Sequence, residues 1–245
     1  MVVNCLVTHC VPVNASVYRI LLQPGDGDNR RFSFKAGQYL NIQQPNGQSN
    51  PFSIASSPDQ ADQLELHIDH HDSTAPIIQL LQNEGAVTVE LPLGDCCLPA
   101  PLSFKTGAPI ILVAASTGYA QMQSILLNLL NRGLSNPIHL YWGAKQASGF
   151  YLMDQLESLQ QQHDNFHFTP VVSDVTEHCQ WQGREGLLHQ VIIDDFDNLS
   201  DAEVYISGSP LMVYATLDVL TDHGLPEKQA YSDVFHYAPR EKVSK

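Results

Sequence analysis

Three short segments in the second half of the chain combine glycine with small polar residues, and each follows an apolar run. The segment STG follows PIILVAA, the segment WGA follows IHLY, and the segment SGSP follows EVYI. Glycine lets a phosphate approach the backbone, and the N-terminus of a following helix supplies N–H donors and partial positive charge. The standard phosphate loops Gly-x-Gly-x-x-Gly and Gly-x-x-x-x-Gly-Lys-Ser/Thr do not occur. Together the three segments predict a nucleotide site, with candidate residues Ser116, Thr117, Gly118, Trp142, Gly143, Gly208 and Pro210.

A fourth segment, NPFSIASSP at residues 50–58, joins a proline, an aromatic ring and a cluster of hydroxyl groups. Two interpretations are open from these residues alone. The segment is either a turn fixed by its proline between two strands, or a rigid platform for a ligand.

Other groups are weaker candidates for chemistry. His67, His70 and His71 lie close together, but on a strand only the first and third share a face, so we expect no metal site there. Positive charge is scarce, so Lys145 and Arg184 are candidates for a cofactor phosphate, with an ordinary surface ion pair as the alternative.

Two patterns of secondary structure position these segments. The first hundred residues alternate short β-type runs with Gly, Pro, Asn and Asp turns, broken only by a short helix at APIIQLLQN. This pattern predicts an antiparallel Greek-key β-barrel. After residue 108, strands and helices alternate from PIILVAA to a last strand AYSDVFHY, which predicts a doubly wound parallel sheet with helices on both faces. We therefore expect two domains, at residues 1–103 and 108–245.

Composition limits the partners of the chain. It has 245 residues, with 12 Lys and Arg against 26 Asp and Glu, for a net charge of −14. This balance argues against nucleic acid and against anionic membrane surfaces. No secretory signal or long apolar span is visible, and the five cysteines include no Cys-x-x-Cys pair. We therefore expect a cytoplasmic protein with free thiols and no cysteine-bound iron–sulfur cluster.

The segments FKAGQYLNI, NPFSIASSP, LELHI, ILVAASTGYAQMQSILL, IHLYWGA and WQGREG resemble the ferredoxin–NADP⁺ reductase superfamily over nearly the whole chain. Within it, the chain is most similar to the small NAD(P)H:flavin reductases. The resemblance implies an N-terminal flavin-binding barrel, a C-terminal nicotinamide-nucleotide domain, and hydride transfer from NADH or NADPH to riboflavin, FMN or FAD. A flavin-dependent enzyme that takes up reduced flavin is the partner it implies.

The resemblance also assigns roles to residues. The flavin signature of the family, Arg-x-Tyr/Phe-Ser, falls on Asn50, Pro51, Phe52 and Ser53. It implies that Phe52 lies beside the isoalloxazine and that the Ser53 hydroxyl acts near flavin N5. An aromatic residue near the flavin would be Phe235 or Tyr237.

Two departures from the family pattern shape the functional expectation. Asn50 replaces the arginine that meets a flavin phosphate, and Ala115-Ser116 replaces two glycines of the Gly-Gly-Thr-Gly loop. We therefore expect a flavin reductase whose flavin is a loosely bound substrate. The alternatives are a catalytically silent flavin- or nucleotide-binding module and an electron-transfer component that passes electrons to a partner protein.

Overall fold

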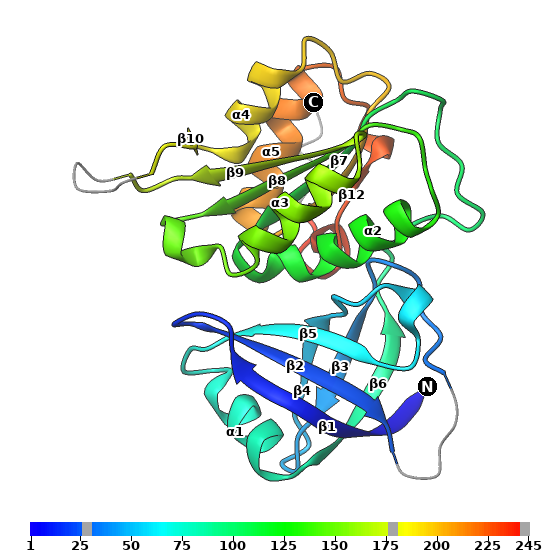
Figure 1. Ribbon diagram of the computed structural model, residues 1–245, viewed down its shortest axis with the longest axis vertical. Coiled ribbons are helices and arrows are strands. Elements are labelled where there is room, and N and C mark those ends of the chain that lie inside the picture. Colours follow the sequence, from blue (N-terminus) through cyan, green and yellow to red (C-terminus); the bar gives the residue numbers. More distant parts are fainter. Residues whose placement is uncertain (26–30, 176–180, 241–245) are drawn as a thin grey trace. The chain divides into compact units, whose positions relative to one another are not determined.

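Six antiparallel strands form the sheet of the N-terminal part of the chain (Figure 1). The computed structural model describes residues 1–25, 31–175 and 181–240. The strands are β1 (Val2–Pro12), β2 (Val17–Pro24), β3 (Tyr39–Gln43), β4 (Ser49–Ser53), β5 (Leu64–Asp69) and β6 (Ala86–Leu93). Their order is β4-β3-β6-β1-β2-β5. The N–H of Ala55, just beyond β4, donates to the carbonyl of Glu65 in β5 at 2.7 Å, which joins the two edges of the sheet into the predicted barrel.

The core of this barrel follows from alternation along the strands. Leu64, Leu66 and Ile68 of β5 point to one side and are fully or almost fully buried. Helix α1 (Ala75–Asn83) has the predicted bounds and buries one apolar stripe. A single 3₁₀ turn, η1 (Pro58–Gln60), precedes β5.

The segment at residues 50–58 is not a turn. Its first residues belong to strand β4, which pairs with β3 in the register Ser53 to Tyr39 and Asn50 to Ile42. Pro51 lacks a backbone N–H, and β4 tolerates it because this strand lies at the edge of the sheet order. The true turn precedes β4, at residues 44–48.

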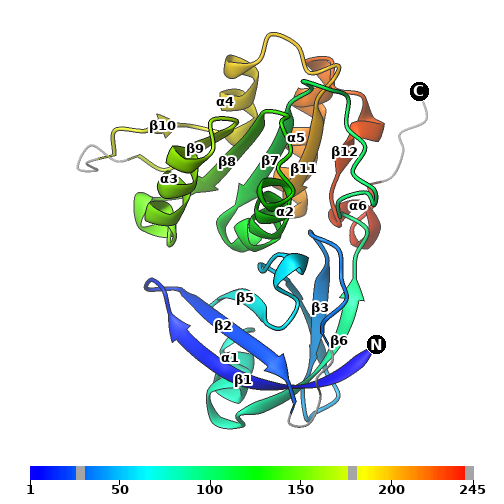
Figure 2. The ribbon, with the colours of Figure 1, turned by 45° about the vertical axis from the view of Figure 1, so that its right-hand side comes forward.

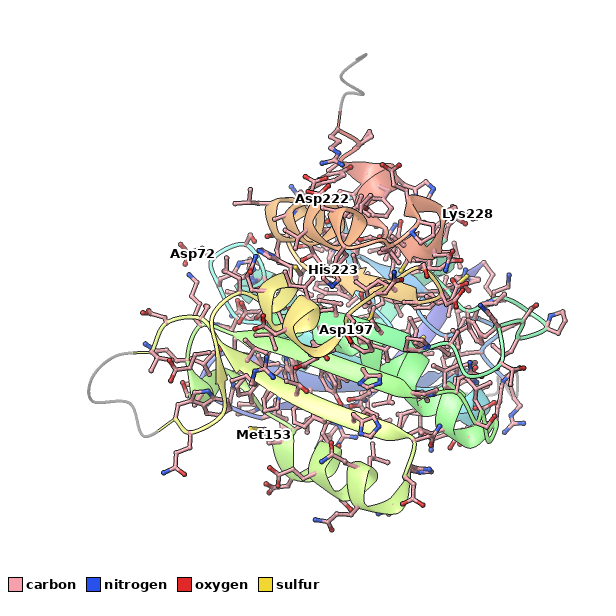
Figure 3. All side chains as sticks on the ribbon, turned by 90° about the horizontal axis from the view of Figure 1, so that it is seen from above. Asp72, Met153, Asp197, Asp222, His223 and Lys228 are labelled. Carbon is pink, nitrogen blue, oxygen red and sulfur yellow. The ribbon has the colours of Figure 1, made fainter. Side chains whose placement is uncertain are left out.

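The C-terminal part holds a parallel sheet of six strands (Figure 2). The strands are β7 (Ile110–Ala115), β8 (Ile138–Ala144), β9 (Phe166–Val172), β10 (Arg184–Glu185), β11 (Glu203–Ser207) and β12 (Ala230–Tyr231). The helices of this part are α3 (Met153–Gln162), α4 (Leu188–Asp195), α5 (Pro210–Asp222) and α6 (Val234–Tyr237). The 3₁₀ turn η3 (Ala147–Gly149) precedes α3, and η4 (Glu227–Gln229) lies between α5 and α6. Figure 3 shows Met153 of α3 on one side of the sheet and Asp222 of α5 on the other, as predicted for a doubly wound sheet.

The strand order β10-β9-β8-β7-β11-β12 reverses direction beside β7. The chain moves outward from β7 through β8 and β9, then returns to place β11 on the other side of β7. In an open parallel sheet, ligands bind beyond the carboxyl ends of the strands at such a reversal. The fold therefore points to the ends of β7 and β11.

The last predicted strand, AYSDVFHY, is wrong in its second half. Strand β12 ends at Tyr231, and α6 begins at Val234. The Ser232 hydroxyl accepts a hydrogen bond from the N–H of Val234 at 3.3 Å. This local bond offers the backbone a turn in place of a strand ladder.

Residue contacts group the chain into two compact units. The first comprises Met1–Ala100 and Thr117–Leu134, and the second comprises Pro101–Ser116 and the chain from Ser135 onward. Helix α2 (Tyr119–Asn131) therefore groups with the antiparallel sheet, although it follows β7 in sequence. The predicted bounds 1–103 and 108–245 stay a prediction. Among the described residues, none of the helices has the length and hydropathy needed to span a bilayer.

Candidate functional site

The ends of β7 and β11 meet at the reversal of the parallel sheet. Ser207, the last residue of β11, pairs with Ala114 of β7, so Gly208 follows beside Ala115. A Cβ atom at Gly208 would lie 3.2 Å from the Cβ of Ala115 and 2.2 Å from the Cε of Met212. A side chain at position 208 would therefore have to displace the end of the Met212 side chain and would lie in tight contact with Ala115.

The loop that leaves β7 adopts a conformation that suits glycine. Ser116 has φ = 50°, a left-handed value that costs a residue with a Cβ about 1–2 kcal/mol. Residues Ser116–Gly118 form a 3₁₀ turn (η2), and α2 begins after Gly118 without a hydrogen bond from a capping side chain. The backbone of this loop thus keeps the shape of a glycine loop even though serine replaces glycine.

Trp142 holds the same loop by a hydrogen bond to its backbone. Its side chain is fully buried, and its indole N–H donates to the carbonyl of Ser116 at 2.9 Å. The rings of Phe150 and Tyr151 contact it edge-on, with centroids 5.2 and 5.0 Å away. The structure places Trp142 as a support of the loop, and its contact with a nucleotide stays a prediction.

The segment after β11 starts a helix. Ser209 is the N-cap of α5, and its hydroxyl accepts a hydrogen bond from the N–H of Met212 at 3.4 Å. Pro210 takes the first helical position, where its missing N–H costs nothing. Leu211, the next residue, is 84% exposed.

Gly143 near the end of β8 has a packing role. A Cβ atom there would come within 2.8 Å of the Leu188 side chain at the start of α4. Glycine therefore allows the start of α4 to approach the end of β8.

Arg184 is held by carboxylates. Its guanidinium donates to Asp195 at 2.7 Å and lies 3.6 Å from Asp194, both at the end of α4. Asp195 also accepts a hydrogen bond from the Tyr141 hydroxyl at 2.8 Å. The hydrogen bond that Arg184 donates to Asp195 raises the pKa of Arg184. The ion-pair alternative therefore describes the observed contacts of Arg184, while Lys145 is an exposed residue that follows β8.

The two aromatic candidates near the C-terminus differ in burial. Phe235 packs against the core of the parallel-sheet unit, with its ring 5.7 Å from that of Tyr214. Tyr237 is 66% exposed. Their assignment to the flavin stays a prediction.

The candidate flavin segment on β4 presents two faces. Phe52 pairs with Leu40, which is fully buried, and Phe52 itself packs against the barrel core. Because cross-strand partners share a face, Pro51 and Ser53 point to the opposite side, with Tyr39 beside Ser53. The structure thus brings Pro51 and Ser53 together and separates both from Phe52, which supports the strand from within.

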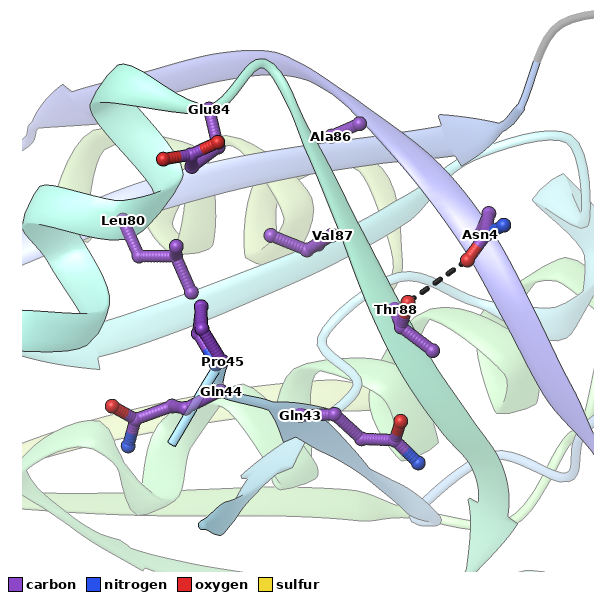
Figure 4. Close-up of a pocket in the computed structure, with 9 residues that line it drawn as sticks. All are labelled: Asn4, Gln43, Gln44, Pro45, Leu80, Glu84, Ala86, Val87 and Thr88. Atoms are coloured by element: carbon purple, nitrogen blue, oxygen red, sulfur yellow. Dashed lines mark hydrogen bonds between the residues drawn. The ribbon is translucent and has the colours of Figure 1, made fainter. Parts of the chain in front are cut away.

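Asn50, at the position of the family arginine, is tied to the turn before β4. Its Oδ1 accepts a hydrogen bond from Gln44 Nε2 at 2.7 Å. Gln44 also lines a cavity of about 530 Å³, whose wall includes Leu80 and Val87 (Figure 4). Among the residues that line this cavity, Glu84 is charged and there is no Lys or Arg. The described residues that line this cavity therefore offer amide groups and no cation for a phosphate.

A buried polar network in the first unit was missed by the sequence prediction. Glu65 of β5 accepts hydrogen bonds from Arg19 at 2.7 Å and from His67 Nε2 at 2.8 Å. Gln123 of α2 donates to the same carboxylate at 3.3 Å, and the Tyr119 ring stacks on His67 with centroids 6.1 Å apart. His67 is thus a core histidine satisfied by a carboxylate, and no cluster of metal-ligating residues occurs in the part of the chain that the structure describes.

The network changes the proton affinity of its members. Burial by itself would raise the pKa of Glu65, but hydrogen bonds and charge from His67 and Arg19 lower it to about 2. Burial also raises the pKa of Tyr119 above its usual range. Glu65 is therefore a carboxylate at neutral pH, held inside the protein by its partners.

The only sequence signal for this network was the alternation in LELHID. It placed the two polar side chains on the face opposite the core, where solvent is the default expectation. The structure instead leaves Glu65 only 9% and His67 only 5% exposed, because α2 covers them.

Comparison with known proteins agrees with this architecture. Residues 112–218 match the family described as an oxidoreductase NAD-binding domain. A probable flavin reductase of Photobacterium leiognathi is 32% identical over 97% of this chain and 100% of its own. An NAD(P)H-flavin reductase of Vibrio harveyi is also 32% identical, over 91% of this chain and 93% of its own.

Among solved structures, the cytochrome P450 reductase of Amycolatopsis has the same fold. Its TM-score is 0.84 at 24% identity, over 95% of this chain and 69% of its own. The switch-point geometry, the two sheets and the full-length similarity agree, and the chain belongs to the flavin reductase family, with the fold of ferredoxin–NADP⁺ reductases.

Proposed function

We propose that this protein is an NAD(P)H-dependent flavin reductase that releases its reduced flavin. The observation that carries the proposal is the meeting of β7 and β11 at the reversal of the parallel sheet. There the loop from Ser116 to Gly118 and the start of α5 both follow strand ends. This is where open parallel sheets bind nucleotides.

On the nucleotide side, the backbone carries the recognition. The loop after β7 keeps a left-handed residue at Ser116, and α2 starts directly after Gly118 with its N-terminal N–H groups toward that loop. Trp142 holds the Ser116 carbonyl, so the loop shape is fixed before a nucleotide binds. We assign the pyrophosphate of NADH or NADPH to this loop.

On the flavin side, the outward face of β4 carries the recognition. Pro51 and Ser53 share that face, and Phe52 packs behind it against the barrel core. A flat, amphipathic ring needs an apolar surface and a few polar groups at its edge. We assign the isoalloxazine to this face, with the Ser53 hydroxyl as the hydrogen-bonding group near N5.

The flavin acts as a substrate in this proposal. Residues 39–53, which form β3, β4 and their turn, contain no Lys or Arg, and Asn50 bonds to Gln44. A flavin phosphate therefore finds no charged partner on this hairpin, so FMN and FAD should gain no charged contact over riboflavin, and all three should bind weakly and exchange freely.

The reaction transfers one hydride. The hydride leaves C4 of the reduced nicotinamide with its electron pair and arrives at N5 of the flavin, and a solvent proton completes the reduced flavin. The protein has to hold the two ring systems in contact, since hydride transfer requires reacting atoms within about 3–3.5 Å. Ser53 orients the acceptor ring, and a flavin-dependent enzyme in the cytoplasm is the proposed consumer of the product.

The test is the oxidation of NADH, and in parallel of NADPH, with and without added riboflavin. Oxidation that requires added flavin is the expected result. Ser53→Ala should lower kcat on the order of tenfold, the loss expected for one hydrogen bond of about 1.4 kcal/mol. Ser49→Ala is the matched control, because Ser49 lies on the same face of the same strand and is exposed.

Two results would contradict the proposal. A folded wild-type protein that oxidises neither nucleotide with any flavin would be a silent binding module. A protein that retains stoichiometric flavin through dialysis would instead fit an electron-transfer component.

A further inference from the structure

The candidate flavin segment is attached to helix α2 by a buried hydrogen bond. The hydroxyl of Ser124 donates to the carbonyl of Ser56 at 2.8 Å, across 68 positions of the chain. Ser124 is fully buried and Ser56 is 6% exposed. Ser124 therefore cannot touch a flavin, yet it holds the backbone three residues beyond Ser53.

Strand β5 holds the same segment from the other side. The N–H of Glu65 donates to the Ser56 hydroxyl at 3.1 Å, and the Glu65 carbonyl accepts from the N–H of Ala55 at 2.7 Å. The N–H of Ile54 donates to the carbonyl of Gln38. Each residue from 54 to 56 is thus fixed by at least one backbone bond to another element.

A cluster of charged and polar side chains connects helix α2 and strand β5, the two elements that hold this segment. Glu65 binds Arg19 of β2 and His67 of β5 and accepts a hydrogen bond from Gln123 of α2. The side chains of Glu65 and His67 are 12% and 0% exposed, whereas that of Arg19 is 35% exposed, so the Arg19–Glu65 pair is partly buried. The cluster thus links β2, β5 and α2 at the Glu65 carboxylate.

We propose that Ser124 is a positioning residue for the flavin and that the backbone of Glu65 holds the same segment. These contacts fix residues 55 and 56 from α2 and from β5, and so set the orientation of Ser53 on the outward face of β4. This inference rests on the proposed function, since it takes the face of Pro51 and Ser53 as the flavin surface. A displacement of a positioning group by about 1 Å can cost on the order of 100-fold in rate.

The experiment measures riboflavin binding by quenching of riboflavin fluorescence, which requires no turnover. Ser124→Ala is compared with Thr216→Val, which likewise removes one buried helix hydroxyl but bonds only within α5, to Met212. Thermal unfolding and the KM values for riboflavin and NADH are measured on the same samples. Glu65→Gln is a comparison variant, because it leaves the backbone bonds from Glu65 to residues 55 and 56 in place.

The expected result is a Kd and KM for riboflavin raised about 5- to 10-fold in Ser124→Ala, with the KM for NADH within about twofold of wild type. Thr216→Val should leave the riboflavin Kd unchanged. Should Glu65→Gln fail to fold, Ser124→Ala still decides the question.

Three outcomes would overturn the inference. An unchanged riboflavin Kd in Ser124→Ala, with lowered thermal stability, would make the contact merely structural. An equal rise of the KM values for riboflavin and NADH would indicate that the substitution perturbs the whole protein and not the flavin segment alone. Wild-type protein that does not bind riboflavin would remove the flavin surface itself, and with it both this inference and the proposed function.

Discussion

Each unit of the protein contains an arginine, a carboxylate and a ring side chain joined by short hydrogen bonds, but the two networks differ in burial. The barrel network consists of Arg19, Glu65 and His67, with contacts of 2.7 and 2.8 Å. The sheet network consists of Arg184, Asp195 and Tyr141, with the same two distances. The Glu65 side chain is 12% exposed, whereas that of Asp195 is 29% exposed.

The networks also hold different parts of the fold. The barrel network joins β2, β5 and α2 around the segment that carries Ser56. The sheet network joins the short strand β10 and the end of α4 to β8. Equal bond lengths therefore do not imply equal contributions, because desolvation makes a buried carboxylate depend on its partners far more than a hydrated one.

The largest expected difference is in stability. Glu65→Gln removes the negative charge that faces the buried His67 and the partly exposed Arg19, and should lower the free energy of unfolding by about 2–4 kcal/mol. Asp195→Asn should cost about 1 kcal/mol or less, because Arg184 and Asp195 remain in reach of water. Denaturant titration of both variants gives the two values. Similar losses in the free energy of unfolding would show that the difference in burial does not change how much each network contributes to stability.

The second difference is in pH dependence. The pKa of Glu65 falls from 4.5 to about 2 in the folded protein, so the unfolded chain binds the proton more tightly. The stability from this group is therefore complete above about pH 5 and is lost as pH falls toward 2, by about 3 kcal/mol at most. The difference in free energy of unfolding between wild type and Glu65→Gln, measured by urea titration, should therefore become smaller as the pH falls across this range. A constant advantage from pH 6 to pH 3 would contradict the lowered pKa.

The smallest effect is expected within the sheet network. Tyr141→Phe removes the hydroxyl that donates to Asp195, and should lower the free energy of unfolding by about 0.5–1 kcal/mol. Riboflavin affinity should stay unchanged, since Tyr141 lies on β8 in the second unit. A loss of more than about 2 kcal/mol in the free energy of unfolding would show that the sheet network contributes as much to stability as the barrel network.

The sequence predicted the elements that depend on local pattern. The alternation of Leu64, Leu66 and Ile68 predicted β5, and the apolar stripe of APIIQLLQN predicted α1 with its bounds. The glycine segments after β7 and β11 predicted the strand ends that the sheet brings together. These features need only a period of side chains along one segment, or a residue type at its end.

Elsewhere, local pattern predicted the wrong structure or left alternatives open. The residues after Tyr231 have strand composition, but the Ser232 hydroxyl bonds to the backbone and α6 follows. For residues 50–58 the sequence left a turn and a ligand platform open, and the structure places the first of these residues on the edge strand β4, which has room for Pro51. In both cases a single hydrogen bond or a free edge decided between conformations of similar local propensity.

By itself, the sequence determined the two kinds of sheet, the order of their elements and the residue types at the candidate site. Only the tertiary structure decided that Glu65 and His67 are buried, that Arg184 is held by Asp195, and that Phe52 and Ser53 face opposite sides of β4. The physical reason is that a strand pattern divides side chains into two faces without stating what covers each face. Helix α2 covers the polar face of β5, and this contact joins residues more than 50 positions apart.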